Sequence, residues 1–213
     1  YRNINNVALP TGNHDVDRFM SLPGATPEGA MMHIAFVLST RGIPQLYYGQ
    51  EIGMTGGHDP DNGKDLHGFI EQENTPLPIS QERIRQFTSQ WIKLRRSIKA
   101  LREGRTIDLH YDDDSYVFGR VFEQASALRN RSNSYAVVAF NTSDKVKVVT
   151  LLNHAIGDST YLATVLSDHN RHKSYPGHPD AKVTLNEKHE LVLRLPARSI
   201  AIYSADLVIT TQN

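Results

Sequence analysis

The sequence of 213 residues contains no cysteine, which excludes disulfide bonds and thiol chemistry. It also has no excess charge of either sign, because 23 Lys and Arg residues balance 23 Asp and Glu residues. Neither a nucleic acid nor an anionic membrane is therefore an expected partner. No apolar run approaches the roughly 20 residues that a membrane-spanning helix needs. Nothing near Tyr1 resembles a signal peptide, and without cysteines as a guide the localisation stays undetermined.

The first fifty residues predict a β–α–β unit. Residues 5–10 (NNVALP) form a short apolar run that indicates a buried strand. A helix is predicted over 26–41, because Thr26 precedes Pro and Glu at its start and Gly42 follows its end. Residues 43–48 then predict a second short buried strand. Strands joined in this way normally pair in parallel in a sheet that helices cover.

The rest of the chain changes character near residue 104. A helix is predicted over 80–103, with Ser80 as its N-cap and Trp91 in the middle of its apolar face, packed in the core. From residue 105 onward, short alternating or apolar runs are separated by Asn, Asp, Ser, Gly and Pro, a pattern that predicts an antiparallel β-sandwich. The acidic stretch at 111–115 (YDDDS) is interpreted as a hairpin turn.

The most polar motif of the first half is TGNHDVDRF at 11–19. Taken alone, its Asn-His-Asp triplet is a plausible turn or helix cap, because Asn and Asp side chains bond nearby backbone N–H groups. Asp17 is predicted to be a solvated acid. In the next strand region, Tyr47 and Tyr48 are expected to pack inside the protein.

These motifs, in this order, resemble the end of the catalytic domain in the alpha-amylase family of glycoside hydrolases, and within it the neopullulanase and cyclomaltodextrinase branch. The residues that carry the resemblance are NHDVDRF, RGIPQLYYGQEIGM and the GGHDPDN loop. The resemblance implies an α/β plus all-β fold. Residues 1–104 would be the C-terminal portion of a (β/α)8 barrel, with strands and helices seven and eight, and 105–213 an antiparallel β-sandwich domain.

The resemblance also gives roles to the polar motif. Asp15 matches the carboxylate that stabilises the oxocarbenium-like transition state of a retaining enzyme, and is the predicted catalytic residue. His14 matches a neighbouring group that binds sugar hydroxyls. Arg18 is assigned to substrate binding, with a structural ion pair as its alternative. No residue of the chain is assigned to a metal.

The implied activity is hydrolysis of the α-1,4 glucosidic bonds of maltodextrin, cyclodextrin or pullulan. Hydrolysis of α-1,6 glucosidic bonds is a further option. The family's nucleophile and acid–base residues lie on strands four and five, which match nothing in residues 1–213. We therefore expect a C-terminal fragment, inactive alone, whose partners are an α-glucan and the missing N-terminal part of the same protein. Two alternatives stay open: a non-catalytic carbohydrate-binding or structural module, and a transglycosylase of the same fold.

Two other polar segments contain side chains that could bind a metal. Asp59, Asp61 and Asn62 offer oxygen ligands, but their spacing is not that of an EF-hand, and Lys64 stands where the branch usually has an Arg nearby. The segment 168–180 contains three His residues between predicted strands, at a spacing that fits no firm ligand pattern (His169, His172 and His178). No cofactor is predicted for the chain, and calcium binding by the longer protein stays open.

Overall fold

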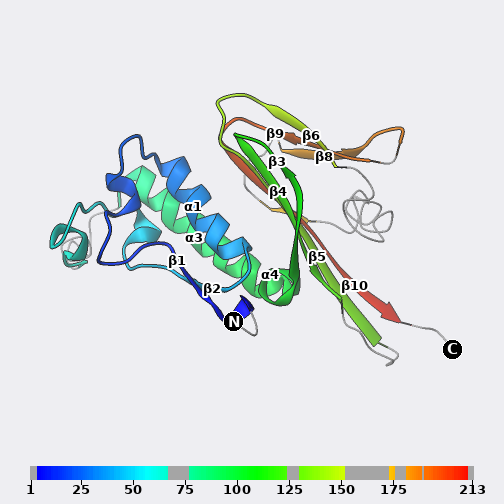
Figure 1. Ribbon diagram of the computed structural model, residues 1–213, viewed down its shortest axis with the longest axis horizontal. Coiled ribbons are helices and arrows are strands. Elements are labelled where there is room, and N and C mark those ends of the chain that lie inside the picture. Colours follow the sequence, from blue (N-terminus) through cyan, green and yellow to red (C-terminus); the bar gives the residue numbers. More distant parts are fainter. Residues whose placement is uncertain are drawn as a thin grey trace. The chain divides into compact units, whose positions relative to one another are not determined.

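The computed structural model describes residues 4–66, 77–123, 130–151, 173–175, 181–188 and 190–210. The chain divides into two compact units, Tyr1–Arg95 and Arg96–Asn213, in a mixed arrangement of helices and sheets (Figure 1). In the described parts of the chain, no helix combines the length and the apolar character that crossing a membrane requires.

The first unit contains the predicted β–α–β arrangement. Strand β1 (Ala8–Pro10) pairs in parallel with β2 (Ile43–Gln45), and helix α1 (Pro27–Ser39) connects them. The hydroxyl of Thr26 caps α1 by accepting a hydrogen bond from the Gly29 N–H at 3.1 Å, which confirms the predicted helix start. Gly42 has a φ of 101°, and a Cβ there would lie 2.7 Å from the carbonyl oxygen of Val7, so glycine is required where β2 approaches β1.

Both strands are shorter and more exposed than predicted. Residues Ile4–Asn6 form a 3-10 helix (η1) instead of the start of a strand, and β2 ends at Gln45. The prediction of buried strands is wrong for the described residues: Ala8 and Pro10 are exposed, and Ile43 is 54% exposed. A sheet of two short strands has open edges, so it buries few of its own side chains.

Helix α3 (Ile79–Ser97) runs alongside α1 (Figure 1). Trp91 is fully buried on its apolar face, as predicted. The predicted N-cap is wrong, because Ser80 lies inside the helix and the Pro78 carbonyl already accepts the N–H of Glu82 at 2.9 Å. Near the other end, the buried Arg95 donates to carbonyls in the last turn of α1 and just after it, at 2.6–3.0 Å (Leu38, Thr40 and Gly42).

The predicted helix over 80–103 is in fact two helices. Ile98 has extended backbone angles (φ −96°, ψ 109°), and a short helix, α4 (Lys99–Glu103), begins after it. The buried Arg120 lies against the end of α4 and donates to the carbonyls of Leu101 and Gly104 at 3.3 and 2.8 Å. A buried arginine in a strand left no recognisable pattern in the sequence.

The second unit contains two antiparallel sheets. The larger has the order β3-β4-β5-β10-β7 and the smaller β6-β9-β8. Their bounds are Arg105–Tyr111 (β3), Ser115–Phe122 (β4), Asn130–Asn141 (β5), Lys147–Leu151 (β6), Lys173–Tyr175 (β7), Lys182–Leu185 (β8), Leu191–Leu195 (β9) and Ser199–Thr210 (β10). Side chains of both sheets form one hydrophobic core, including Val117, Ala139 and Leu195. Alternating inward residues on facing sheets produce such a core.

The acidic stretch between β3 and β4 forms the predicted turn. The Asp112 Oδ1 atom accepts the backbone N–H groups of Asp114 and Ser115 at 2.9 and 2.7 Å, and Lys147 Nζ at 2.7 Å. Strand β3 itself was not predicted. The segment containing His169, His172 and His178 lies outside the described residues.

Candidate active site

The Asn-His-Asp motif follows the carboxyl end of β1 and is anchored to the end of β2. The backbone N–H of Thr11 donates to Gln45 O at 2.9 Å, and the Thr11 hydroxyl accepts the N–H of Tyr47 at 3.1 Å. The Gln50 side chain donates to the Thr11 carbonyl at 3.1 Å. The loop that carries the motif therefore starts from a fixed point where two parallel strands end, which is where α/β folds place their ligand sites.

Within the loop, the side chain of Asn13 closes the turn, whereas the side chains of His14 and Asp15 are presented to solvent. The Oδ1 atom of Asn13 accepts the Asp15 N–H at 2.8 Å, which is the local turn that Asn favours. The side chains of His14 and Asp15 are 76% and 70% exposed, and their Nε2 and Oδ1 atoms lie 3.4 Å apart. The motif therefore forms a turn, as it was interpreted, and also presents two polar side chains to solvent.

Asp15 lines a pocket of about 400 Å³. Its polar lining includes a second pair that sequence reasoning missed, in which Asp17 Oδ1 lies 2.9 Å from Nδ1 of His58. Asp17 is only 30% exposed, so the prediction of a solvated acid is wrong. The remaining lining is mostly apolar (Val16, Phe19 and Leu22, with Thr11 and His33). A concave, largely apolar surface with a few convergent polar groups is typical of ligand pockets.

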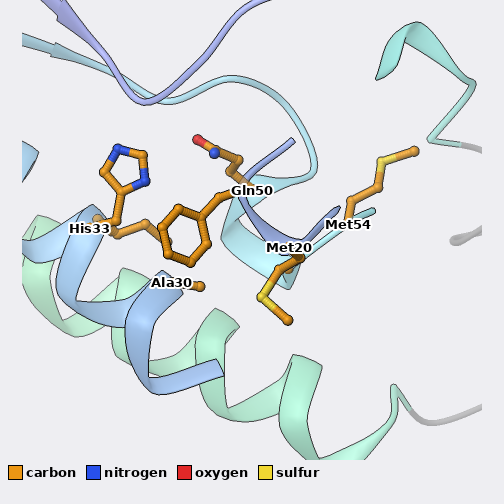
Figure 2. A pocket seen from close by; sticks show the side chains of 8 residues that line it. Met20, Ala30, His33, Gln50 and Met54 are labelled. Atoms are coloured by element: carbon orange, nitrogen blue, oxygen red, sulfur yellow. The ribbon is translucent and has the colours of Figure 1, made fainter. Parts of the chain in front are cut away.

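A smaller cavity of about 10 Å³ shares Phe19 and His33 with this pocket. Figure 2 shows His33 and Ala30 on α1 and Gln50 and Met54 on the segment after β2 around it. Burial lowers the pKa of His33, which favours the neutral ring. The cavity has room for about one water molecule, and the buried Oε1 of Gln50 has no hydrogen-bond partner among the described residues.

Arg18 is 2% exposed and lies beneath the loop. Its Nε donates to the carbonyl oxygen of Asn62 at 2.8 Å and its Nη1 to that of Tyr48 at 2.6 Å. The guanidinium carbon lies 4.6 Å from the ring centroids of both Tyr47 and Tyr48, a distance at which cation–π attraction operates. Both rings contact Arg18, but the prediction that both tyrosines pack inside the protein is wrong for Tyr48, which is 37% exposed.

This position bears on both sequence hypotheses for Arg18. Among the described residues, no carboxylate pairs with Arg18, so the ion pair gains no support, and its buried Nη2 has no hydrogen-bond partner. The assignment of Arg18 to substrate binding stays a prediction. Its guanidinium instead joins three segments: the motif loop, the end of β2 and the loop around Asn62. A planar fork that donates in two directions suits this role.

The loop over 56–64 is folded through its own polar groups. Asp61 Oδ2 accepts the Gly57 N–H at 2.7 Å, and its Oδ1 lies 3.2 Å from Lys64 Nζ. The hydrogen bond from Gly57, with Lys64 second, lowers the pKa of Asp61. Asn62 is fully buried, and its Nδ2 donates to the carbonyls of His14 at 2.6 Å and Val16 at 3.2 Å. Of the oxygen groups considered for calcium, the carboxylate of Asp61 is engaged within the loop, whereas the buried Oδ1 of Asn62 has no hydrogen-bond partner among the described residues. The described residues contain no cluster of three His, Asp or Glu residues that could hold a metal.

Comparison with known proteins identifies the family of the chain. Residues 2–139 match the alpha-amylase family, described as "Alpha amylase, catalytic domain". The chain belongs to this family, as the sequence resemblance predicted.

Two curated relatives illustrate the range of the match. A cyclomaltodextrin glucanotransferase of Bacillus sp. (strain 1-1) is 32% identical over 149 residues, which is 70% of this chain and 18% of the relative. An alpha-amylase of Niallia circulans is 31% identical over 147 residues, 67% of this chain and 26% of that protein. The chain therefore spans about a fifth to a quarter of the length of these relatives.

Solved structures with the same fold cover nearly all of the chain. The alpha-amylase of Geobacillus thermoleovorans, complexed with acarbose, superposes with a TM-score of 0.67 at 23% identity, over 94% of this chain and 39% of that one. The debranching enzyme of Nostoc punctiforme gives a TM-score of 0.67 at 25% identity, over 93% and 35%.

Proposed function

We propose that the full-length protein containing this chain is a retaining α-glucan hydrolase that cleaves α-1,4 glucosidic bonds of maltodextrin, cyclodextrin or pullulan, with α-1,6 bonds as a second target. The observation that carries the proposal is the exposed Asp15–His14 pair, in which Asp15 lines a pocket after a parallel strand in a chain of the alpha-amylase family. Neopullulanase and cyclomaltodextrinase are the branch that the motifs favour.

In this proposal Asp15 acts on the transition state. As the glycosidic bond breaks, positive charge develops on the sugar ring, and hydrogen bonds from the sugar hydroxyls to a fixed carboxylate strengthen. Among the described residues, no backbone group donates to the carboxylate of Asp15, so its lone pairs remain available to hydroxyl groups. His14, beside it, supplies ring nitrogens to a neighbouring hydroxyl. The nucleophile and the general acid are proposed to come from residues outside this chain, so the 213 residues alone should show no turnover.

We further propose the domain organisation that the motifs imply. Residues 1–104 would contribute strands and helices seven and eight of a (β/α)8 barrel, which is supported by the parallel β1–β2 pair and by α1 and α3. Residues 105–213 would be the family's C-terminal β-sandwich, supported by two antiparallel sheets with a shared core.

A glucanotransferase is the second candidate. The observation that favours it is that several of the curated relatives are cyclomaltodextrin glucanotransferases. Transfer and hydrolysis differ in the acceptor that removes the sugar from the enzyme intermediate, and both use the same transition-state carboxylate.

One product analysis tests both candidates. The full-length protein is incubated with maltodextrin, cyclodextrin and pullulan, and new reducing ends and cyclic products are measured separately. Reducing ends support hydrolysis, whereas cyclic products without a matching rise in reducing ends support transfer. Absence of both, together with glucan binding that survives removal of residues 1–104, would instead indicate a non-catalytic binding module.

A further inference from the structure

Asn62 stands out because it is a fully buried amide that touches the motif loop on both sides of Asp15. Its Nδ2 donates to the carbonyl of His14 at 2.6 Å and to that of Val16 at 3.2 Å. Both partners are carbonyl oxygens, which only accept hydrogen bonds, so the orientation of the amide is fixed by chemistry. Forty-eight residues separate Asn62 from His14 in the sequence.

Asn62 is itself held in place from several directions. Its backbone carbonyl accepts Nε of Arg18 at 2.8 Å, and the N–H of Arg18 donates to Gly56 O at 2.9 Å. A Cβ on Gly56 would lie 2.8 Å from the Cα of Asn62, so the loop is packed closely around this residue. The side-chain amide of Asn62 is therefore fixed in position, and the motif loop is hydrogen-bonded to it.

Asp15 has little else to fix it. Among the described residues, its carboxylate pairs only with the exposed His14, and its backbone is bonded to Asn13, which is also exposed. The contacts with a fully buried side chain that lie nearest to Asp15 along the chain are those that Asn62 makes with its two neighbours. The carbonyl of His14 belongs to the peptide unit that leads into Asp15, and the carbonyl of Val16 belongs to the unit one residue beyond it. The amide therefore holds the backbone before and after Asp15, and the position of the carboxylate follows that backbone.

We propose that Asn62 is a positioning residue, which fixes the backbone on both sides of Asp15 and thereby sets the distance of the Asp15 carboxylate from the reacting sugar. This inference rests on the proposed function, in which Asp15 stabilises the transition state. Misplacement of a reacting group by about 1 Å can lower a rate by about 100-fold, so a residue that never touches substrate can affect turnover this strongly.

The test compares Asn62→Asp with a control in the same loop, in the full-length protein. Asn62→Asp is nearly isosteric but sets a carboxylate oxygen against two carbonyl oxygens. Asp61→Ala removes the bonds to Gly57 and Lys64 without touching residues 13–18. Calorimetric titration with acarbose measures the number of folded binding sites, and kcat is expressed per acarbose-binding site. Partial unfolding lowers the number of sites but leaves the kcat per site unchanged.

We expect Asn62→Asp to lower kcat per site by about 10- to 100-fold, with KM changed much less, and Asp61→Ala to stay within about twofold of the wild type. Wild-type kcat per site in Asn62→Asp, or an equal loss in Asp61→Ala, would overturn the inference. If Asn62→Asp binds no acarbose, Asn62→Ser is judged by the same criteria, since its small hydroxyl introduces no charge.

Asp15→Asn in the same series distinguishes a failure of the proposed function from a failure of the positioning role of Asn62. If Asp15→Asn retains turnover, the proposed function itself is wrong. If Asp15→Asn is inactive while Asn62→Asp and Asn62→Ser keep full kcat per site, only the positioning role fails.

Discussion

The motif loop after β1 and the β3–β4 turn are both acidic turns, yet they use their carboxylates in opposite ways. In the β3–β4 turn, Asp112 accepts two backbone N–H groups and the ammonium of Lys147. In the motif loop, the neutral Asn13 accepts the turn's N–H, and the carboxylate of Asp15 remains exposed. The difference shows that an acidic residue is available for chemistry when another side chain satisfies the backbone around it.

The largest expected effect on the stability of the motif loop comes from removing the hydrogen bonds of Arg18. Arg18→Lys keeps the charge but loses the fork that donates to Asn62 O and Tyr48 O, which should destabilise the loop by about 2–3 kcal/mol. Hydrogen exchange of the peptide 11–18 should then become about 30- to 100-fold faster.

Arg120→Lys is the matched control for this measurement, because Arg120 is also buried and donates to backbone carbonyls, in the second unit. It should leave exchange in 11–18 unchanged. If both variants accelerate exchange in 11–18 equally, the support is not local to Arg18.

A smaller effect is expected from removing the turn acceptor. Asn13→Ala leaves the N–H of Asp15 without its 2.8 Å partner, so Asp15 should sample positions away from the sugar and kcat should fall about tenfold. Asn186→Ala removes a similar turn acceptor between β8 and β9, where its Oδ1 accepts the N–H groups of Lys188 and Glu190. Unchanged kcat in Asn13→Ala, or an equal loss in Asn186→Ala, would contradict this account of the loop.

The smallest expected effect is the pH dependence of the stability that Asp112 contributes. The hydrogen bond from Lys147, with those from the backbone, holds the pKa of this carboxyl well below its usual range. A depressed pKa contributes stability that is fully present above the unfolded-state value of about 3.9 and is lost as the pH falls below it. The Tm difference between wild type and Asp112→Asn should therefore be constant above about pH 5 and shrink below about pH 4. A pH-independent Tm difference for Asp112→Asn would refute the explanation.

The sequence predicted those features that local patterns encode. The helix start at Thr26, the buried face around Trp91 and the turn at Asp112 depend on residues a few positions apart. Contacts that are distant in the chain left no such pattern. The hydrogen-bond partners of Arg18 (Tyr48 and Asn62) lie 30 and 44 residues away, and its assignment to substrate binding stays a prediction.

The same limitation applies to the site as a whole. His14 and Asp15 could be proposed because their motif resembles a family pattern, and their catalytic roles stay predictions. The Asp17–His58 pair, the amide of Asn62 and the buried Arg120 have no local signature, since each depends on how separate segments come together.

The most direct test of the account compares Asp15→Asn with Asp112→Asn in the full-length protein, with kcat/KM measured on maltodextrin. If Asp15 is the acid kept available for chemistry, Asp15→Asn should lower kcat/KM by about 10²- to 10³-fold while the protein stays folded. Asp112→Asn should remain within about twofold of the wild type, as for an exposed substitution outside the site. Equal activities in the two variants, or a greater loss in Asp112→Asn, would contradict the central claim.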